Sequence, residues 1–121
     1  MKTVFRADAS IEIGTGHVMR CLTLAERLRT AGHVSHFICR DLPGNLACFI
    51  EGCNFHVHLL PAPATWGGGS ISAGTPHHAA WLGVPREVDA RDTAGALQQL
   101  GPDIDWLVVA FLIILLNVQA D

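Results

Sequence analysis

The sequence predicts an α/β fold with a parallel sheet, and three observations lead to that prediction. Short apolar runs of β-type composition alternate with segments of helical periodicity. A glycine-containing turn separates the first run from the first helical segment. The length of 121 residues corresponds to one ordinary domain. Because a parallel connection needs a dozen or more residues and a helix supplies them, strands that alternate with helices are expected to pair in parallel.

The first part of the chain is predicted to begin with a strand over Thr3–Phe5, which the turn Gly14–Gly16 follows. From His17, apolar residues recur at helical spacing with charged residues between them, which is typical of an amphipathic helix. Gly32 is well placed to end this helix, because glycine adopts the backbone conformation of a C-cap without strain. A second strand is predicted over residues 34–39.

The remaining segments continue this alternation. A short helix is predicted to include residues 45–51, a third strand covers 55–60, and a longer helix covers 88–100. Asp89 and Asp92 fall in the first turns of the longer helix, where the helix dipole favours acids. A fourth strand follows this helix. The order of strands and helices therefore predicts a Rossmann-like parallel sheet.

Composition and charge narrow the classes of partner. Lys and Arg number 8 and Asp and Glu number 11, which gives a formal net charge of −3. A mildly acidic chain lacks the electrostatic attraction that drives nucleic-acid binding, so no DNA or RNA partner is expected. Hydrophobic residues make up 50% and charged residues 16%, against about 25% charged in typical soluble domains. Some apolar surface is therefore expected to meet a partner.

The amino terminus and the cysteines both indicate a cytoplasmic protein. The first twelve residues contain four charged side chains and no uninterrupted apolar run, so we expect no secretory signal peptide. The four cysteines lack the paired spacing of a zinc site, and in a reducing cytoplasm they are interpreted as small buried hydrophobes. These cysteines are Cys21, Cys39, Cys48 and Cys53.

The turn after the first strand is the most informative stretch for function. Such a loop opens at the carboxyl edge of the sheet, where the next helix points its free N–H groups, so anions or sugar hydroxyls can bind there. A dinucleotide fingerprint would require glycine at position 19, which is Met19, so NAD binding is disfavoured. A Walker A loop would need a Gly-Lys-Ser or Gly-Lys-Thr ending, which the loop lacks, and this excludes ATP hydrolysis by that route.

His17 is the candidate catalytic residue of this loop. In the first turn of a helix, the positive end of the dipole disfavours imidazolium, and a neutral imidazole can accept a proton as a general base that activates water. Gly14 and Gly16 on its amino-terminal side allow a substrate to approach the backbone closely. The alternative is that His17 only caps or packs at the start of the helix.

Other polar residues have structural alternatives that we prefer. Asp8 and Glu12 could pair their carboxylates or bind a metal, but no ligand-spaced histidine accompanies them, so turn or helix capping is the better interpretation. His56 and His58 share one face of a strand and could chelate zinc, yet no third ligand is spaced to complete a site. Arg40 and the aspartate after it could line the crevice, but a surface ion pair is the simpler interpretation.

Three segments carry a resemblance to a known family. Residues 5–22 contain the pattern Arg-x-Asp-x-Ser followed by Ile-Gly-x-Gly-His-x-Met-Arg-Cys-Leu, and residues 37–45 and 105–109 extend the match. This long, gap-free pattern resembles the amino-terminal half of the UDP-2,4-diacetamido-2,4,6-trideoxy-β-L-altropyranose hydrolases of pseudaminic acid biosynthesis. The resemblance covers about residues 1–109.

The resemblance implies a fold, a reaction and a set of site residues. The family is similar to two-domain GT-B glycosyltransferases and hydrolyses the bond between the anomeric carbon and UDP with inversion. The implied substrate is a UDP-sugar, and no metal or redox cofactor is implied. The family's general base falls on His17, and Gly14, Thr15 and Gly16 fall beside the substrate. Arg6 and Asp8 fall at the floor of the cleft.

The end of the chain departs from the family. Trp106–Leu116 is a run of eleven apolar residues, too short for the roughly 20 that span a bilayer and longer than the roughly five or six of a usual strand. The family continues instead with a polar turn that leads to a nucleotide-binding second domain. We therefore expect a Rossmann-like domain over residues 1–109, an atypical apolar tail over 110–121, and no carboxyl-terminal domain. We expect such a junction from a frameshift or premature stop.

These features predict a truncated UDP-sugar hydrolase that is weakly active or inactive alone, since catalysis depends on holding the reactants together. Two alternatives stay open. One is a non-catalytic binding module whose apolar tail docks on a second domain or a partner protein that completes the cleft. The other is a GT-B glycosyltransferase domain, which would transfer the sugar to an acceptor and not to water.

Overall fold

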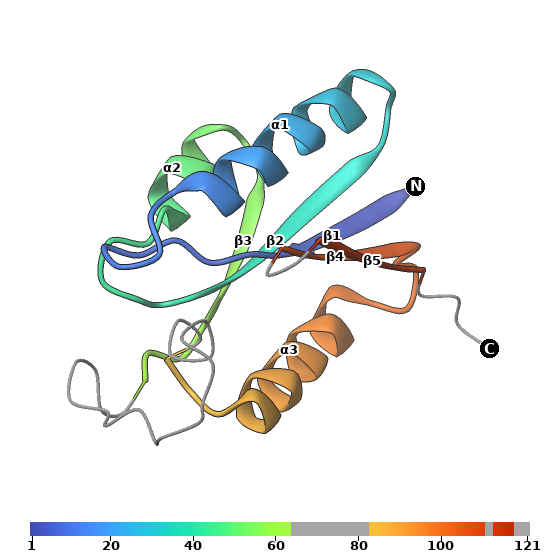
Figure 1. Cartoon of the computed structure of the whole chain (residues 1–121). Coiled ribbons are helices and arrows are strands. Elements are labelled where there is room, and N and C mark those ends of the chain that lie inside the picture. The colour runs from blue at the N-terminus through green and yellow to red at the C-terminus, as the bar shows by residue number, and fades with distance from the viewer. Residues whose placement is uncertain (64–82, 111–112, 118–121) are drawn as a thin grey trace.

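The computed structural model describes residues 1–63, 83–110 and 113–117, which form an α/β domain with one sheet (Figure 1). The strands are β1 (Lys2–Arg6), β2 (Val34–Arg40), β3 (His56–Leu60), β4 (Trp106–Ala110) and β5 (Ile113–Asn117), and the helices are α1 (Gly16–Thr30), α2 (Ala47–Gly52) and α3 (Arg86–Leu100). The strand order is β3-β2-β1-β4-β5. Strands β1 to β4 pair in parallel, which confirms the predicted Rossmann-like arrangement.

The last strand was not predicted. The apolar run is divided between β4 and β5, which pair antiparallel with Val108 opposite Leu115. The tail that sequence analysis separated from the domain therefore contributes residues 113–117 to the same sheet. A continuous apolar run contains no glycine, proline or polar turn residue to mark a break, so its division into two strands is not visible in the sequence.

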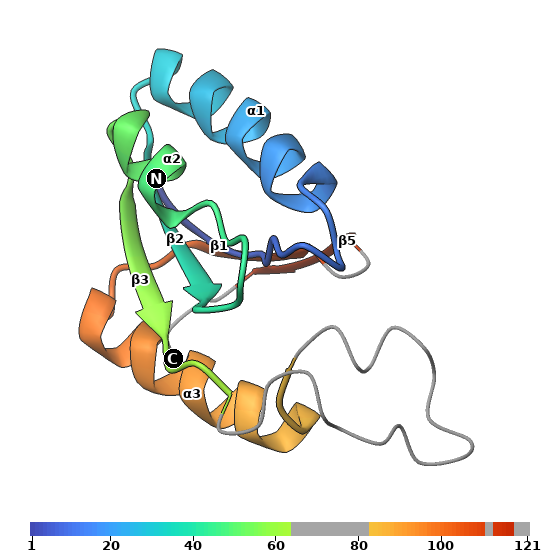
Figure 2. The same ribbon diagram turned by 90° about the vertical axis from the view of Figure 1, so that its left-hand side faces the viewer.

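The helices lie on both faces of the sheet. Helices α1 and α2 cover one face and α3 covers the other, as two perpendicular views show (Figures 1 and 2). Successive strand residues point to opposite faces, so Phe5 packs in the core beneath α1 whereas Val4 packs in the core beneath α3. Gly32, with φ +87°, follows the end of α1 as predicted. Within the described ranges, no helix is long and apolar enough to cross a bilayer.

The larger core lies between the sheet and α1. The rings of Phe5 and Phe37 stack with their centroids 5.0 Å apart, and the ring of Phe55 lies 5.6 Å from that of Phe37. Cys21 and Cys39 are buried in this core, as predicted, but the prediction was wrong for Cys48, which is exposed, and Cys53 is half-buried. Burial raises the pKa of the Cys21 thiol to about 11 and that of the Cys39 thiol to about 12. Both thiols are therefore inert hydrophobes at neutral pH.

Phe37→Ala is predicted to lower the free energy of unfolding by about 3–5 kcal/mol, because the fully buried ring leaves a cavity. Phe49→Ala is the matched control, since the Phe49 side chain on α2 is 50% exposed, and a change within about 0.5 kcal/mol is expected. Urea unfolding followed by circular dichroism measures both values. Equal losses in the two variants would contradict this description of the core.

Candidate functional site

The candidate site lies at the carboxyl edge of the sheet, where the loop from β1 to α1 begins. Ala7 N–H donates to the Ile38 carbonyl oxygen at 3.2 Å and so extends the pairing of β1 with β2. The loop then closes on Ser10, whose carbonyl oxygen accepts from Gly14 N–H at 2.8 Å and whose hydroxyl accepts from Ile13 N–H at 2.9 Å. Gly14 has φ +82°, a conformation that glycine adopts without strain. The turn before His17 is therefore a closed, hydrogen-bonded unit.

The loop from β2 to α2 supports this turn from the side. Ile11 N–H donates to the Pro43 carbonyl oxygen at 3.0 Å. Gly44 has φ +85°, and a Cβ atom there would lie 2.9 Å from the Ile11 backbone nitrogen, so the two loops approach as closely as a glycine allows. The β2–α2 loop and residues 62–63 line an open depression of about 390 Å³ at the same edge. The two loops thus form one continuous rim.

His17 is the second residue of α1 and is partly exposed. Thr15 precedes the helix as its N-cap residue, without a side-chain capping bond, and Met19 N–H donates to the Thr15 carbonyl oxygen at 2.9 Å. Val18 is buried against the sheet and anchors this first turn. A Cβ atom at Gly16 would meet no atom within 4 Å among the described residues, so the backbone before His17 faces open space.

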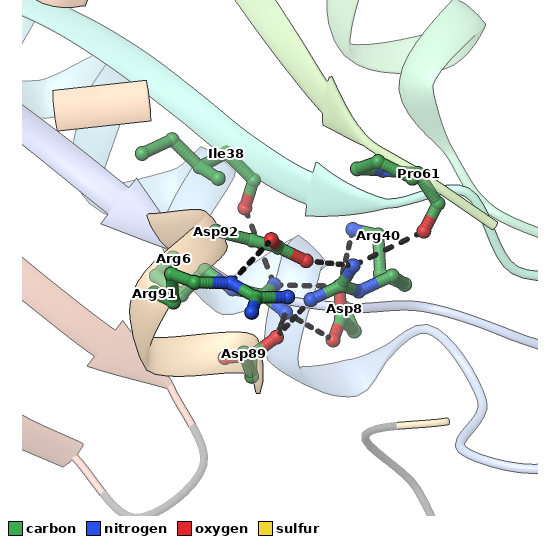
Figure 3. A network of polar contacts seen from close by, with 8 residues as sticks. All are labelled: Arg6, Asp8, Ile38, Arg40, Pro61, Asp89, Arg91 and Asp92. Carbon is green, nitrogen blue, oxygen red and sulfur yellow. Dashed lines mark hydrogen bonds and ion pairs between the residues drawn. The ribbon is translucent and has the colours of Figure 1, made fainter. Parts of the chain in front are cut away.

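A buried ion-pair network lies at this edge, at the end of β1 (Figure 3). The Arg6 guanidinium donates to both carboxylate oxygens of Asp8, at 2.6 Å and 3.0 Å. It also donates to Asp89 of α3 at 2.6 Å. The side chains of Arg6 and Asp8 are 4% and 5% exposed, so this pair is desolvated and its two-point geometry is well defined.

Arg40, the last residue of β2, extends the network to other segments. Its guanidinium donates to Asp89 at 2.7 Å, to Asp92 at 2.8 Å, and to the Pro61 carbonyl oxygen at 3.1 Å. Its backbone N–H donates to Asp8 at 2.7 Å. Two guanidinium groups and three carboxylates thus connect the ends of β1, β2 and β3 with the first turns of α3.

The ionisation of the network follows from its mutual pairing. Burial alone lowers the pKa of the Arg6 guanidinium, but Asp8 and Asp89 outweigh it and hold that pKa above its usual value. Burial alone raises the pKa of the Asp89 carboxyl, but Arg6 and Arg40 outweigh it and hold that pKa below its usual value. Arg6 and Asp89 are therefore charged at neutral pH.

The predicted site residues fall into two groups in the structure. Arg6 and Asp8 bind each other beneath the rim, whereas Gly14, Thr15, Gly16 and His17 follow one another at the loop's end and the start of α1. Their functional roles stay predictions.

Two interpretations of other polar residues were wrong. Asp8 does not cap a turn or a helix, because its carboxylate binds the Arg6 guanidinium and the Arg40 backbone N–H. The interpretation of Arg40 as a surface ion pair with the aspartate after it was wrong, because Arg40 is 1% exposed and pairs with α3. His56 and His58 lie on β3, and the described residues contain no cluster of three or more groups that could hold a metal ion.

Sequence analysis did not assign Asp89 and Asp92 to the site. The available signal was helical spacing, because the two acids lie four residues before Thr93 and Ala96, which are the buried residues of α3. Acids that continue a buried stripe indicate buried cations on the opposing sheet. Their position in the first turns of the helix, where the dipole favours acids, would by itself leave Asp89 and Asp92 exposed to solvent.

Comparison of the sequence with models of protein families finds no matching family, and comparison with curated proteins finds no match. The candidate site therefore depends on its own geometry and on the sequence pattern described above.

Asp89→Asn is predicted to lower the free energy of unfolding at pH 7 by about 2 kcal/mol, because a charged partner of two buried arginines is lost. The folded-state pKa of Asp89 is depressed, so its contribution is present above the unfolded pKa and is lost as pH falls through the folded pKa. The difference between wild type and variant should therefore stay constant from pH 7 down to about pH 5 and then shrink as pH falls below the unfolded pKa of about 3.9.

Urea unfolding at a series of pH values measures this difference, with Asp41→Asn as the control at an exposed aspartate outside the network. A difference that stays constant over the whole range would show that the Asp89 charge does not stabilise the fold.

Proposed function

We propose that this chain is the amino-terminal part of a UDP-sugar hydrolase, with His17 as the general base that activates water. The substrate class is a UDP-2,4-diacetamido-2,4,6-trideoxy sugar, the bond cleaved joins the anomeric carbon to UDP, and the configuration inverts. The observation that carries the proposal is the position of His17. It stands in the first turn of α1, after a closed glycine turn at the carboxyl edge of a Rossmann-like sheet.

The chemistry requires one base and one water molecule on the face of the sugar opposite UDP. The imidazole of His17 takes a proton from water while the water oxygen bonds to the anomeric carbon. The bond from that carbon to UDP breaks at the same time, and UDP leaves with the bonding electron pair. Inversion follows because attack and departure occur on opposite faces.

The residues around His17 have complementary roles in this proposal. Gly14 and Gly16 leave room for the sugar beside the backbone, and Thr15 lies between them at the exposed N-cap. Arg6 and Asp8 form the floor beneath the loop, where their mutual ion pair supports it. No step in this reaction calls for a metal or a redox cofactor.

The UDP moiety is assigned to a second unit. Among the described residues that line the depression of the β2–α2 rim, Asp41 is acidic and none is basic, which disfavours a diphosphate there. We therefore assign nucleotide binding to a carboxyl-terminal domain of the GT-B type or to a partner protein that docks near the apolar tail. A cytoplasmic location is part of this proposal.

The test is UDP release from the UDP-sugar, measured with the chain alone and with the carboxyl-terminal domain of a hydrolase of the resembled family added. Weak release alone and faster release with the added domain are expected. His17→Ala should lower the rate by about 100-fold to 10,000-fold, the usual contribution of a general base.

His33→Gln is the control, because His33 lies beyond the other end of α1, where its ring contacts the amino terminus. Release that persists in His17→Ala would overturn the assignment of the base. Transfer of the sugar to an added acceptor would indicate a glycosyltransferase, and absence of release in both assays would favour a non-catalytic binding module.

A further inference from the structure

The network beneath the site contains an arginine that joins segments far apart in the sequence. The Arg40 guanidinium contacts the start of α3 and the carbonyl group of Pro61, directly after β3. These two contacts lie at opposite ends of the connection between β3 and α3. The fork of a guanidinium can reach such divergent acceptors at once, whereas the single ammonium of a lysine cannot.

The backbone of Arg40 leads from this anchor to the loop that carries His17. The Arg40 N–H donates a hydrogen bond to the Asp8 carboxylate, and the Arg40 carbonyl oxygen accepts one from Leu42 N–H at 2.8 Å. Pro43 directly follows Leu42, and its carbonyl oxygen accepts a hydrogen bond from Ile11 N–H. The β1–α1 loop is therefore tied to the Arg40 segment at two points, Asp8 and Ile11. Any shift of the Arg40 backbone is transmitted to both.

We propose that Arg40 is a positioning residue, whose guanidinium anchors its backbone to the residue after β3 and to α3 on the far face of the sheet and so fixes the loop before His17. A catalytic consequence of this anchoring rests on the proposed function of His17. The coupling of α3 to the loop is a property of the fold. The Asp8 carboxylate accepts three hydrogen bonds, two from the Arg6 guanidinium and one from the Arg40 N–H. In this proposal Asp8 therefore connects the loop before His17 to Arg40.

The test compares amide hydrogen exchange by NMR in the full chain, in Arg40→Lys and in Arg29→Lys. The reporters are the Ile11 and Gly14 amides, whose hydrogen bonds close the loop. Arg40→Lys keeps the charge and loses the fork, so exchange at both reporters should rise by about tenfold or more relative to the amides of β1 and β2. Arg29→Lys is the matched control.

Arg29 suits this comparison because its guanidinium also bonds a backbone carbonyl, that of Cys53 at 2.6 Å, and also packs on another side chain, the Phe55 ring. It lies near the far end of α1, away from the loop before His17. Arg29→Lys should leave the ratio of loop to sheet exchange unchanged. A change equal to that of Arg40→Lys would overturn the proposal.

A second readout separates positioning from a merely structural ion pair. The carbon-bound ring protons of His17 should shift in Arg40→Lys and not in Arg29→Lys, because the ring moves with its loop. If loop and sheet amides accelerate by the same factor and the His17 resonances stay in place, the network only stabilises the fold and the proposal is wrong.

Asp92→Asn covers the case in which Arg40→Lys does not fold, since it removes one partner of Arg40 at a side chain that is 21% exposed. In Asp92→Asn the loop amides should again exchange faster relative to the amides of β1 and β2, but by a smaller factor than in Arg40→Lys. An equal rise in the exchange rates of loop and sheet amides would again overturn the proposal. These measurements need no substrate. They can therefore succeed while UDP release fails, and they can fail while His17-dependent release is observed.

Discussion

Two buried guanidinium groups must be paired, and the rest of this structure depends on that requirement. An unpaired charge away from water is too costly to keep, so Arg6 and Arg40 can lie under the loops only if carboxylates meet them. Asp8 comes from the loop after β1, and Asp89 and Asp92 come from α3. The pairing therefore sets where α3 packs along the sheet and where the loop before His17 begins.

The same constraint explains why the candidate site is divided into two layers. Beneath the rim, Arg6, Asp8 and Arg40 are almost fully buried, and the two arginines also bind the partly buried acids of α3 (Figure 3). On the rim, the glycine turn and the first turn of α1 expose backbone and the imidazole of His17. In the proposed reaction, this polar floor would support the loop that holds His17 against one water molecule.

Much of the fold was predictable because the local signals agree with the final arrangement. Apolar residues at strand and helix spacing, together with turn glycines such as Gly14 and Gly32, gave the order of elements and the parallel sheet. The strand β5 was missed, because a run with no turn residue carries no mark of where one strand ends and the next begins. The burial of Arg40 was missed, because a charged residue at the end of a strand usually faces water.

By itself, the sequence determined the helices, the strands β1 to β4, the glycine turn and the candidacy of His17, since each depends on residues close together in the chain. Only the tertiary structure decided that Asp89 and Asp92 meet Arg40 across more than forty positions of sequence, and that Asp8 binds Arg6 and not solvent. Such pairings depend on which faces of the sheet and of α3 are brought together. Local periodicity shows that an acid lies on an inward stripe, but packing alone selects the cation that it meets.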